Sequence, residues 1–212
     1  KLHDAYFSRG IIYKSKGNTE AALIDYSKAI KINPRFYEVY CNRCDIYIEK
    51  EEYSLALADA NKAIEINPKG FVGYSMRGFV FLKTRDYNKA IADYTEAIEL
   101  NSVDFEAYCH RGFLFGLLNE YGRALEDYSA AIKINPAYTD AYDNRGTLYV
   151  EMKNYERALN DFNKAIEINP IYASAYCNRG SLYAKTENHE QALSDFDKAI
   201  EIDPQYYEAY CQ

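Results

Sequence analysis

A 34-residue period runs through the whole sequence and constrains the fold more than any other feature. Asn-Pro or Asp-Pro pairs recur at Asn33-Pro34, Asn67-Pro68, Asn135-Pro136, Asn169-Pro170 and Asp203-Pro204, and Asn101-Ser102 fills the remaining place in the series. Periods of this length are typical of solenoid proteins, in which each repeat buries its apolar face only against its neighbours. We therefore predict six complete repeats, at residues 3–36, 37–70, 71–104, 105–138, 139–172 and 173–206, and the truncated start of a further repeat at 207–212.

Each repeat contains two stretches with helical spacing. In the first stretch, aromatic residues at the fourth and eleventh positions, such as Tyr6 and Tyr13, stand seven residues apart and share one helical face. A glycine at the eighth position, such as Gly146, costs about 1 kcal/mol relative to alanine in a helix, so its recurrence indicates close helix packing. In the second stretch two alanines flank an aromatic residue, as Ala192 and Ala199 flank Phe196, and the proline then ends the helix. These features predict an antiparallel helical hairpin in every repeat.

The motif aromatic-x2-R-G-x2-Y, followed by A-x3-[YF]-x2-A-x4-P, resembles the tetratricopeptide repeat over residues 3–212. The resemblance implies an all-α, right-handed superhelical solenoid of antiparallel helix pairs. We expect one solenoid domain at residues 3–206, because the core of a repeat array grows linearly with repeat number. Three residues depart from the motif, namely Cys44 for glycine, Ala60 for the aromatic residue of the second helix and Ser102 for proline. We expect each to weaken its own repeat without preventing the fold.

Arginine and aspartate recur at two fixed positions in all six repeats. The pairs are Arg9 and Asp25, Arg43 and Asp59, Arg77 and Asp93, Arg111 and Asp127, Arg145 and Asp161, and Arg179 and Asp195. Because a guanidinium group matches a carboxylate in a bidentate contact, we expect structural ion pairs between the two helices of each repeat. The alternative, in which the arginines form a ladder that binds a ligand, remains open.

Composition and charge exclude several classes of function. The formal net charge is −7, from 25 Lys and Arg against 32 Asp and Glu, and no basic cluster is present that could bind nucleic acid. No apolar run is long enough to span a bilayer, and the first residues, KLHDAYFSRG, contain no signal-peptide core, so we expect no membrane partner. The five cysteines, Cys41, Cys44, Cys109, Cys177 and Cys211, do not have the spacing of a disulfide pair or of a complete zinc site, so we expect reduced thiols in a cytoplasmic protein.

No combination of residues predicts catalysis. The three histidines, His3, His110 and His189, occupy different repeat positions, and none is grouped with a nucleophile or with a set of metal ligands. The glycines are spread along the chain and form no phosphate-binding loop. We therefore predict that the protein is not an enzyme and has no catalytic residue, cofactor or metal.

The resemblance also implies a binding surface, because the first helices of tetratricopeptide repeats line a concave groove. At the positions that face it, repeats 3 and 4 carry apolar residues between acidic and amide-bearing flanks. The residues that we predict to bind a ligand are Glu38, Asn42, Asp45, Met76, Phe79, His110, Phe113, Leu117, Asn144 and Asn178. The asparagine amides can pair with the backbone of an extended peptide. Two alternatives remain open, namely that Phe79 and Phe113 pack between repeats as core and that the asparagines are only solvated.

We therefore predict a non-catalytic protein–protein interaction scaffold or adaptor, whose protein or peptide partner carries apolar and basic residues. Two other interpretations remain open. The repeats could be the regulatory or substrate-recruiting region of a larger enzyme. They could also self-associate through the ends of the solenoid, where we expect the short segment Tyr207–Gln212 to cover Leu193, Phe196 and Ile200 only in part.

Overall fold

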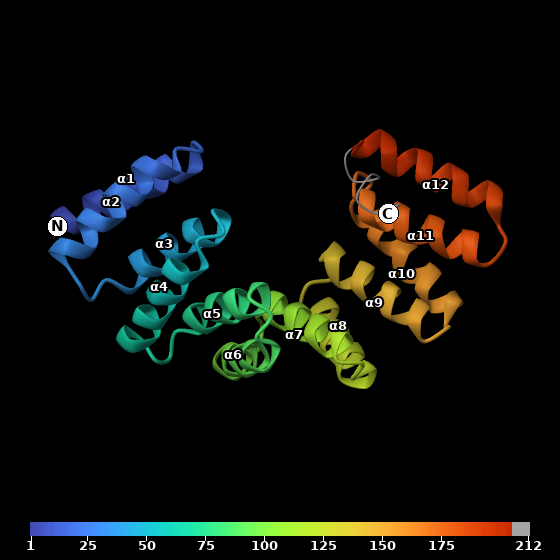
Figure 1. The fold of residues 1–212 in the computed structure, drawn as a ribbon, viewed down its shortest axis with the longest axis horizontal. Coiled ribbons are helices and arrows are strands. Elements are labelled where there is room, and N and C mark those ends of the chain that lie inside the picture. Colours follow the sequence, from blue (N-terminus) through green and yellow to red (C-terminus); the bar gives the residue numbers. More distant parts are fainter. Residues whose placement is uncertain (205–212) are drawn as a thin grey trace. The chain divides into compact units, whose positions relative to one another are not determined.

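A computed structural model describes residues 1–204, and every regular element in that range is an α-helix (Figure 1). The helices are α1 (Leu2–Ser15), α2 (Thr19–Ile32), α3 (Tyr37–Glu49), α4 (Tyr53–Ile66), α5 (Phe71–Lys83), α6 (Tyr87–Leu100), α7 (Phe105–Leu117), α8 (Tyr121–Ile134), α9 (Thr139–Glu151), α10 (Tyr155–Ile168), α11 (Ala173–Lys185) and α12 (His189–Ile202). The first helix of each repeat begins at the predicted repeat start or one residue before it. The predicted further repeat at 207–212 lies outside the described residues.

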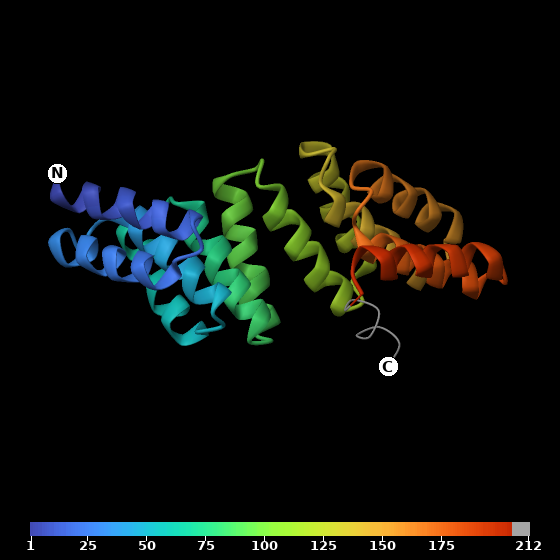
Figure 2. The same ribbon diagram turned by 90° about the horizontal axis from the view of Figure 1, so that it is seen from above.

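Each repeat is a pair of antiparallel helices that lie side by side, as Figures 1 and 2 show for α1 and α2 and for α11 and α12. The predicted all-α fold of helical hairpins is therefore confirmed. The chain divides into two compact units, Lys1–Ala107, here called unit 1, and Tyr108–Gln212, here called unit 2. Unit 1 contains α1 to α6 and the start of α7, and unit 2 contains the rest of α7 and α8 to α12.

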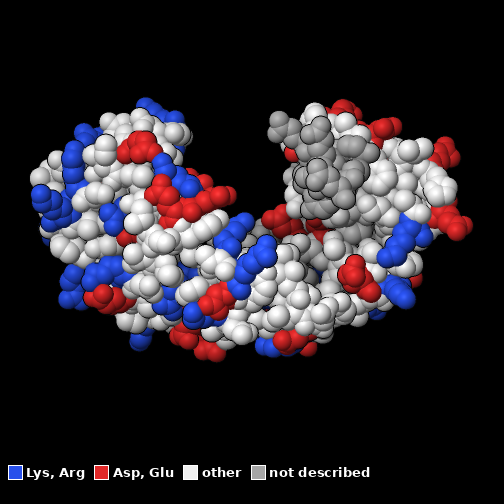
Figure 3. Space-filling model, viewed as in Figure 1, with Lys and Arg blue, Asp and Glu red and all other residues white. Residues whose placement is uncertain are grey.

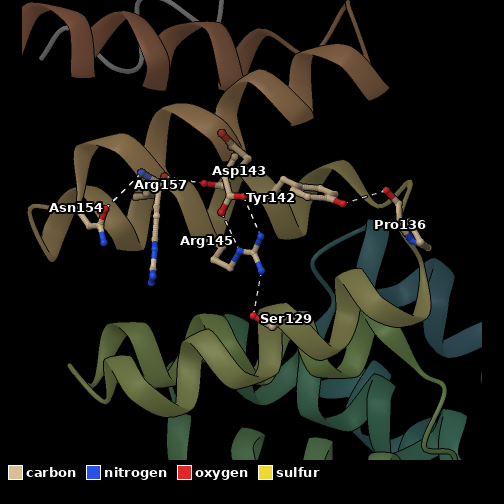
Figure 4. Close-up of polar contacts among 9 residues, drawn as sticks. Ser129, Pro136, Tyr142, Asp143, Arg145, Asn154 and Arg157 are labelled. Atoms are coloured by element: carbon tan, nitrogen blue, oxygen red, sulfur yellow. Dashed lines mark hydrogen bonds and ion pairs between the residues drawn. The ribbon is translucent and has the colours of Figure 1, made fainter.

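The second helices end where the proline pattern predicts. The residue before proline has an extended ψ, for example 86° at Asn67 and 95° at Asp203, because the proline ring disfavours helical geometry there. Asn101, which precedes Ser102, has a ψ of 89°, so the missing proline leaves this turn unchanged. The tyrosine at the fourth repeat position holds the turn by donating a hydrogen bond to the proline carbonyl oxygen, at 3.3 Å in Tyr40, Tyr74, Tyr142 and Tyr176 (Tyr142 in Figure 4).

The recurrent glycine of the first helix faces an aromatic ring of the second helix. A Cβ added to Gly146 would stand 2.6 Å from a ring carbon of Phe162, and a Cβ added to Gly10 would stand 2.5 Å from a ring carbon of Tyr26. Real carbon atoms pack at about 3.5–4.0 Å, so a side chain at these positions would displace the ring. The close helix packing predicted from the glycines is confirmed.

Repeat 2 has the reverse arrangement, with the larger side chain on its first helix. Cys44 stands in the place of the glycine and Ala60 in the place of the aromatic residue, and both are fully buried in one cluster with Ala56 and Val80. The Cys44 thiol donates to the carbonyl oxygen of Ala56 at 3.3 Å. The two departures from the motif are therefore not independent weaknesses, because one side chain fills the space that the other leaves.

All six predicted Arg–Asp pairs form, and each is bidentate. Nε and Nη2 of the arginine donate to the two carboxylate oxygens at 2.6–2.8 Å. The aspartate side chains are only 2–9% exposed, and the Arg9 guanidinium holds the pKa of the Asp25 carboxyl below its ordinary value. These pairs connect the two helices of one repeat, which confirms the structural interpretation.

The same guanidinium groups also link neighbouring repeats, which the sequence pattern alone did not predict. Nη1 of Arg145 on α9 donates to Oγ of Ser129 on α8 at 3.0 Å (Figure 4). Equivalent bonds join Arg43 to Ser27 (3.1 Å), Arg77 to Asn61 (2.8 Å) and Arg179 to Asn163 (2.6 Å). Each of these arginines therefore connects three helices, namely both helices of its own repeat and the second helix of the repeat before it.

Candidate functional site

The first helices of unit 2 form the clearest candidate site. An open cavity of ≈ 350 Å³ is lined by Phe113, Gly116, Leu117, Asn119, Tyr121, Tyr128, Asn144, Thr147, Leu148 and Glu151. A second cavity, of ≈ 180 Å³, is lined by Thr147, Val150, Phe162, Asn178, Ser181, Leu182 and Lys185. Because Thr147 borders both, the cavities adjoin across α7, α9 and α11. We call this surface, defined by Phe113, Leu117, Asn144, Thr147, Val150 and Asn178, the unit 2 groove.

One end of the unit 2 groove is apolar and exposed. Phe113 and Leu117 lie one turn apart on α7, and their side chains are 38% and 47% exposed. The alternative in which Phe113 packs between repeats as core is therefore wrong. Glu151 on α9 lines the same cavity and adds a carboxylate to it. An exposed apolar strip beside polar groups is typical of a surface that binds another protein.

The two predicted asparagines of unit 2 lie in the same groove, with their amide N–H groups already in use. Asn144 Nδ2 lies 3.6 Å from Sγ of Cys109, and Asn178 Nδ2 donates to Asp143 Oδ1 at 2.9 Å and to Ser174 Oγ at 3.4 Å. Among residues 1–204, no hydrogen bond to either amide oxygen is seen. Each oxygen can therefore accept a hydrogen bond from the backbone N–H of an extended ligand.

Asp143 is a candidate functional residue outside the set predicted from the sequence. It is 5% exposed, and in the described part of the chain it is the one buried aspartate without an arginine partner. Its carboxylate accepts hydrogen bonds from Ser174 Oγ at 2.6 Å and from Asn178 Nδ2 at 2.9 Å, which are neutral donors. Burial raises the pKa of Asp143 above its ordinary value. The sequence does mark this position as unusual, because repeats 2, 4 and 6 carry cysteine where repeat 5 carries an aspartate.

Asp143→Asn is expected to raise the melting temperature at neutral pH, because a raised pKa means that folding disfavours the ionised carboxylate. That penalty is present above the folded-state pKa and disappears below the unfolded-state pKa of about 4. The gain should therefore shrink as the pH falls toward 4, in melting curves followed by circular dichroism. Asp161→Asn, which removes the charge from an ion pair, should lower the melting temperature at neutral pH. Shifts of the same sign in both variants would contradict this account.

In unit 1, the predicted site residues on α3 are largely engaged in internal contacts. Asp45 forms an ion pair with Lys14 of α1, and Asn42 Nδ2 donates to the backbone oxygen of Glu38 at 2.8 Å. Acidic side chains gather near the C-terminal end of α3 (Figure 3). Glu38, Asn42 and Asp45 stay predicted binding residues, but Asp45 also holds α3 to α1.

The predicted residues on α5 and the histidine on α7 are half-buried. Met76 packs against two clusters of the unit 1 core, which include Cys44 and Cys41. The Lys83 ammonium lies 5.2 Å from the centre of the Phe79 ring, so this ring has a cation at its face. His110 precedes Phe113 by one turn of α7 in unit 2. The binding role of all three residues remains a prediction.

The cysteines Cys41, Cys44, Cys109 and Cys177 are buried and form no disulfide with one another, and Cys211 lies outside the described residues. Burial raises the pKa of the Cys41 thiol to about 11, which keeps it protonated and a poor nucleophile at neutral pH. Within residues 1–204, no three or more His, Cys, Asp or Glu side chains come together in a group that could hold a metal ion. In the same range, no helix has both the length and the apolar character needed to cross a membrane.

Comparison with known proteins gives family matches in all six repeats. The tetratricopeptide repeat model matches residues 3–36, 105–138 and 173–206, a second tetratricopeptide repeat model matches 37–69 and 73–104, and a TPR repeat model matches 146–187. None of the curated proteins matches the chain.

Solved structures with the same fold are numerous. YrrB, described as a TPR protein with an unusual peptide-binding site, is 28% identical, with a TM-score of 0.64 over 84% of this chain and 92% of its own. PilF of Pseudomonas aeruginosa is 18% identical, with a TM-score of 0.83 over 98% of this chain and 97% of its own. A tetratricopeptide repeat protein from Parabacteroides merdae is 21% identical, with a TM-score of 0.77 over 94% and 79%. PilF and the Parabacteroides merdae protein are less than 25% identical to this chain, so they support the fold alone.

Proposed function

Because the chain belongs to the tetratricopeptide repeat family, we propose that it is a non-catalytic scaffold or adaptor that binds a segment of a partner protein in the unit 2 groove. The observation that carries this proposal is the exposure of Phe113 and Leu117 in a cavity that Glu151 of α9 also lines. The peptide-binding site named for YrrB supports a ligand of this class. We also propose a reducing compartment such as the cytoplasm, which is supported by the four buried cysteines that form no disulfide with one another.

The groove favours a ligand with apolar and basic side chains. An apolar side chain of the partner would remove water from Phe113 and Leu117, which stabilises a complex by about 25 cal/mol for each Å² buried. A lysine or arginine of the partner would face the carboxylate of Glu151. The amide oxygens of Asn144 and Asn178, which accept no hydrogen bond within residues 1–204, would accept hydrogen bonds from the backbone of the partner, independently of its sequence.

Asp143 adds a reason for a basic partner. A buried carboxylate without a cation is costly, whereas the other six buried aspartates each have a guanidinium partner. Asn178, which donates to Asp143, lies at the surface of the groove. A guanidinium or ammonium group of the partner that binds beside this amide would supply the missing positive charge.

Selection of peptides from a random library displayed on phage, with the 212-residue chain as target, tests the proposal. We expect enrichment of peptides that combine apolar residues with lysine or arginine. Phe113→Glu should weaken the binding of a selected peptide at least about tenfold in fluorescence anisotropy, because it places a charge in the apolar end of the groove.

Ile171→Glu is the matched control. Ile171 is 75% exposed, lies before α11 and does not line either cavity. This variant introduces the same charge at an apolar surface residue, and we expect it to leave the affinity unchanged. Equal losses in the two variants, or enrichment of acidic peptides, would contradict the proposal.

A further inference from the structure

One glycine opens the larger cavity of the unit 2 groove. Gly116 on α7 lines this cavity of ≈ 350 Å³, and a Cβ added to it would meet nothing within 4 Å. At the same position the other five repeats carry a side chain, namely Lys14, Ile48, Leu82, Val150 and Ala184. Val150 lines the adjoining cavity, which is smaller, at ≈ 180 Å³. Gly116 therefore leaves open the volume that a side chain at this position would occupy.

The packing of the repeat does not explain this glycine. At Gly112, one turn earlier, an added Cβ would stand 3.1 Å from a ring carbon of Tyr128, so the helix packing favours glycine there. No such contact exists at Gly116, although glycine is less favourable than alanine inside a helix. Glycine without a packing reason is typical of places where a ligand approaches the backbone closely.

The lining of the cavity combines aromatic rings with hydrogen-bond acceptors. Phe113, Tyr121 and Tyr128 contribute the rings, and Glu151 contributes a carboxylate. The amide oxygen of Asn144 and the hydroxyl group of Tyr128 make no hydrogen bond within residues 1–204. Among the described residues that line the cavity there is no lysine or arginine. The cavity therefore suits a cation that has several N–H donors and a flat face.

Arginine meets these requirements better than lysine. Its guanidinium group is planar, stacks on aromatic rings and presents five N–H donors, whereas the lysine ammonium group is a compact, strongly hydrated charge. Unit 2 already contains such a contact, because the guanidinium carbon of Arg123 lies 3.7 Å from the centre of the Phe115 ring. Cavities of about 300–1,000 Å³ hold small ligands, so this one has room for an arginine side chain.

We propose that the cavity beside Gly116 binds one arginine side chain of the partner. The Glu151 carboxylate and the Asn144 amide oxygen accept hydrogen bonds from its guanidinium group, and the aliphatic part of the side chain lies against Phe113. This inference rests on the proposed function, because it places one residue of the ligand inside the unit 2 groove. It narrows the basic character of the partner to arginine at one position.

Gly116→Leu tests the inference with a peptide selected from the phage library as ligand. The leucine side chain would occupy the cavity, so we expect the affinity measured by fluorescence anisotropy to fall at least about tenfold. The melting temperature should equal or exceed that of the wild type, because the new Cβ meets no atom within 4 Å and leucine favours a helix more than glycine does. Gly116→Ala, which fills less of the cavity, should weaken binding less.

Gly122→Leu is the matched control. Gly122 is exposed on α8, and a Cβ added to it would also meet nothing within 4 Å. It does not line the cavity. This variant makes the same substitution at another open glycine of a helix, and we expect it to leave the affinity unchanged.

Substitutions in the selected peptide identify the side chain that enters the cavity. We expect that changing one particular arginine of the peptide to lysine weakens binding to the wild type at least about tenfold. Citrulline, which keeps the shape of arginine but has no charge, should have a similar effect. Both changes should have little further effect on binding to Gly116→Leu, because two changes at one contact are not additive.

The outcomes separate this inference from the proposed function. If Phe113→Glu weakens peptide binding and Gly116→Leu does not, the groove binds the partner but the arginine site is wrong. The same conclusion follows if lysine replaces every arginine of the peptide without loss of affinity. If neither protein variant weakens binding, or if no peptide is selected, the proposed function fails and this inference fails with it.

Discussion

Arg145→Ala is expected to lower the free energy of unfolding by about 3–5 kcal/mol, because it leaves the carboxylate of Asp161 without its positive partner. The Asp161 side chain is 9% exposed and accepts two hydrogen bonds of 2.8 Å from Arg145. The change also removes the hydrogen bond to Ser129, which connects repeat 5 to repeat 4. Urea denaturation followed by circular dichroism measures the loss.

Two further variants make this result specific. Arg157→Ala removes an arginine that is exposed on α10, so we expect a change within about 0.5 kcal/mol. Asp161→Ala combined with Arg145→Ala should cost less than the sum of the two single changes, since no buried charge is left unpaired. If Arg145→Ala left stability unchanged and abolished peptide binding instead, the arginines would be a ligand-binding ladder, and the structural interpretation would be wrong.

Cys44→Gly and Ala60→Tyr are each expected to destabilise the protein, and together they should largely restore it. Ala60→Tyr alone would direct a ring at the thiol of Cys44, and overpacking of this kind costs about 1–3 kcal/mol. Cys44→Gly alone empties part of a buried cluster and adds a helical glycine, at a cost of about 2 kcal/mol. The double variant recreates the glycine and aromatic pair of the other five repeats, so we expect a coupling energy of about 2–3 kcal/mol.

A matched pair of glycine variants checks the same packing from the opposite direction. A Cβ on Gly146 would lie 2.6 Å from the Phe162 ring, whereas a Cβ on Gly116 would meet nothing within 4 Å. Gly146→Ala should therefore destabilise the protein and Gly116→Ala should not.

For the Cys44 and Ala60 variants, the contradicting result is simple addition: if the two single effects add up in the double variant, the two residues do not compensate for each other.

The sequence predicts those parts of the fold that depend on features present in every repeat. The helix starts, the Asn-Pro or Asp-Pro turns and the Arg–Asp pairs follow from residues that recur at a constant spacing, so five or six copies support each inference. The compensation between Cys44 and Ala60 occurs in one repeat only. It depends on which atoms fill a shared space, and spacing alone does not show that.

The candidate site could be predicted in part, because the repeat position of a residue indicates whether its side chain faces the groove. Phe113, Leu117, Asn144 and Asn178 occupy groove-facing positions of the first helices, and the structure places them along the cavities of unit 2. The sequence did not show that Asn178 donates to Asp143, or that Asp45 pairs with Lys14. Such contacts join side chains of neighbouring repeats, and their partners depend on the directions in which the side chains point.

Photo-crosslinking tests the central claim most directly, since it locates the ligand on the surface of the protein. A selected peptide is mixed with the 212-residue chain that carries Phe113→p-benzoylphenylalanine or, as control, Ile171→p-benzoylphenylalanine, and crosslinked fragments are identified by mass spectrometry. If the unit 2 groove binds the ligand, the probe at position 113 should capture the peptide and the probe at position 171 should not. Capture at position 171 together with none at position 113 would contradict the proposed function.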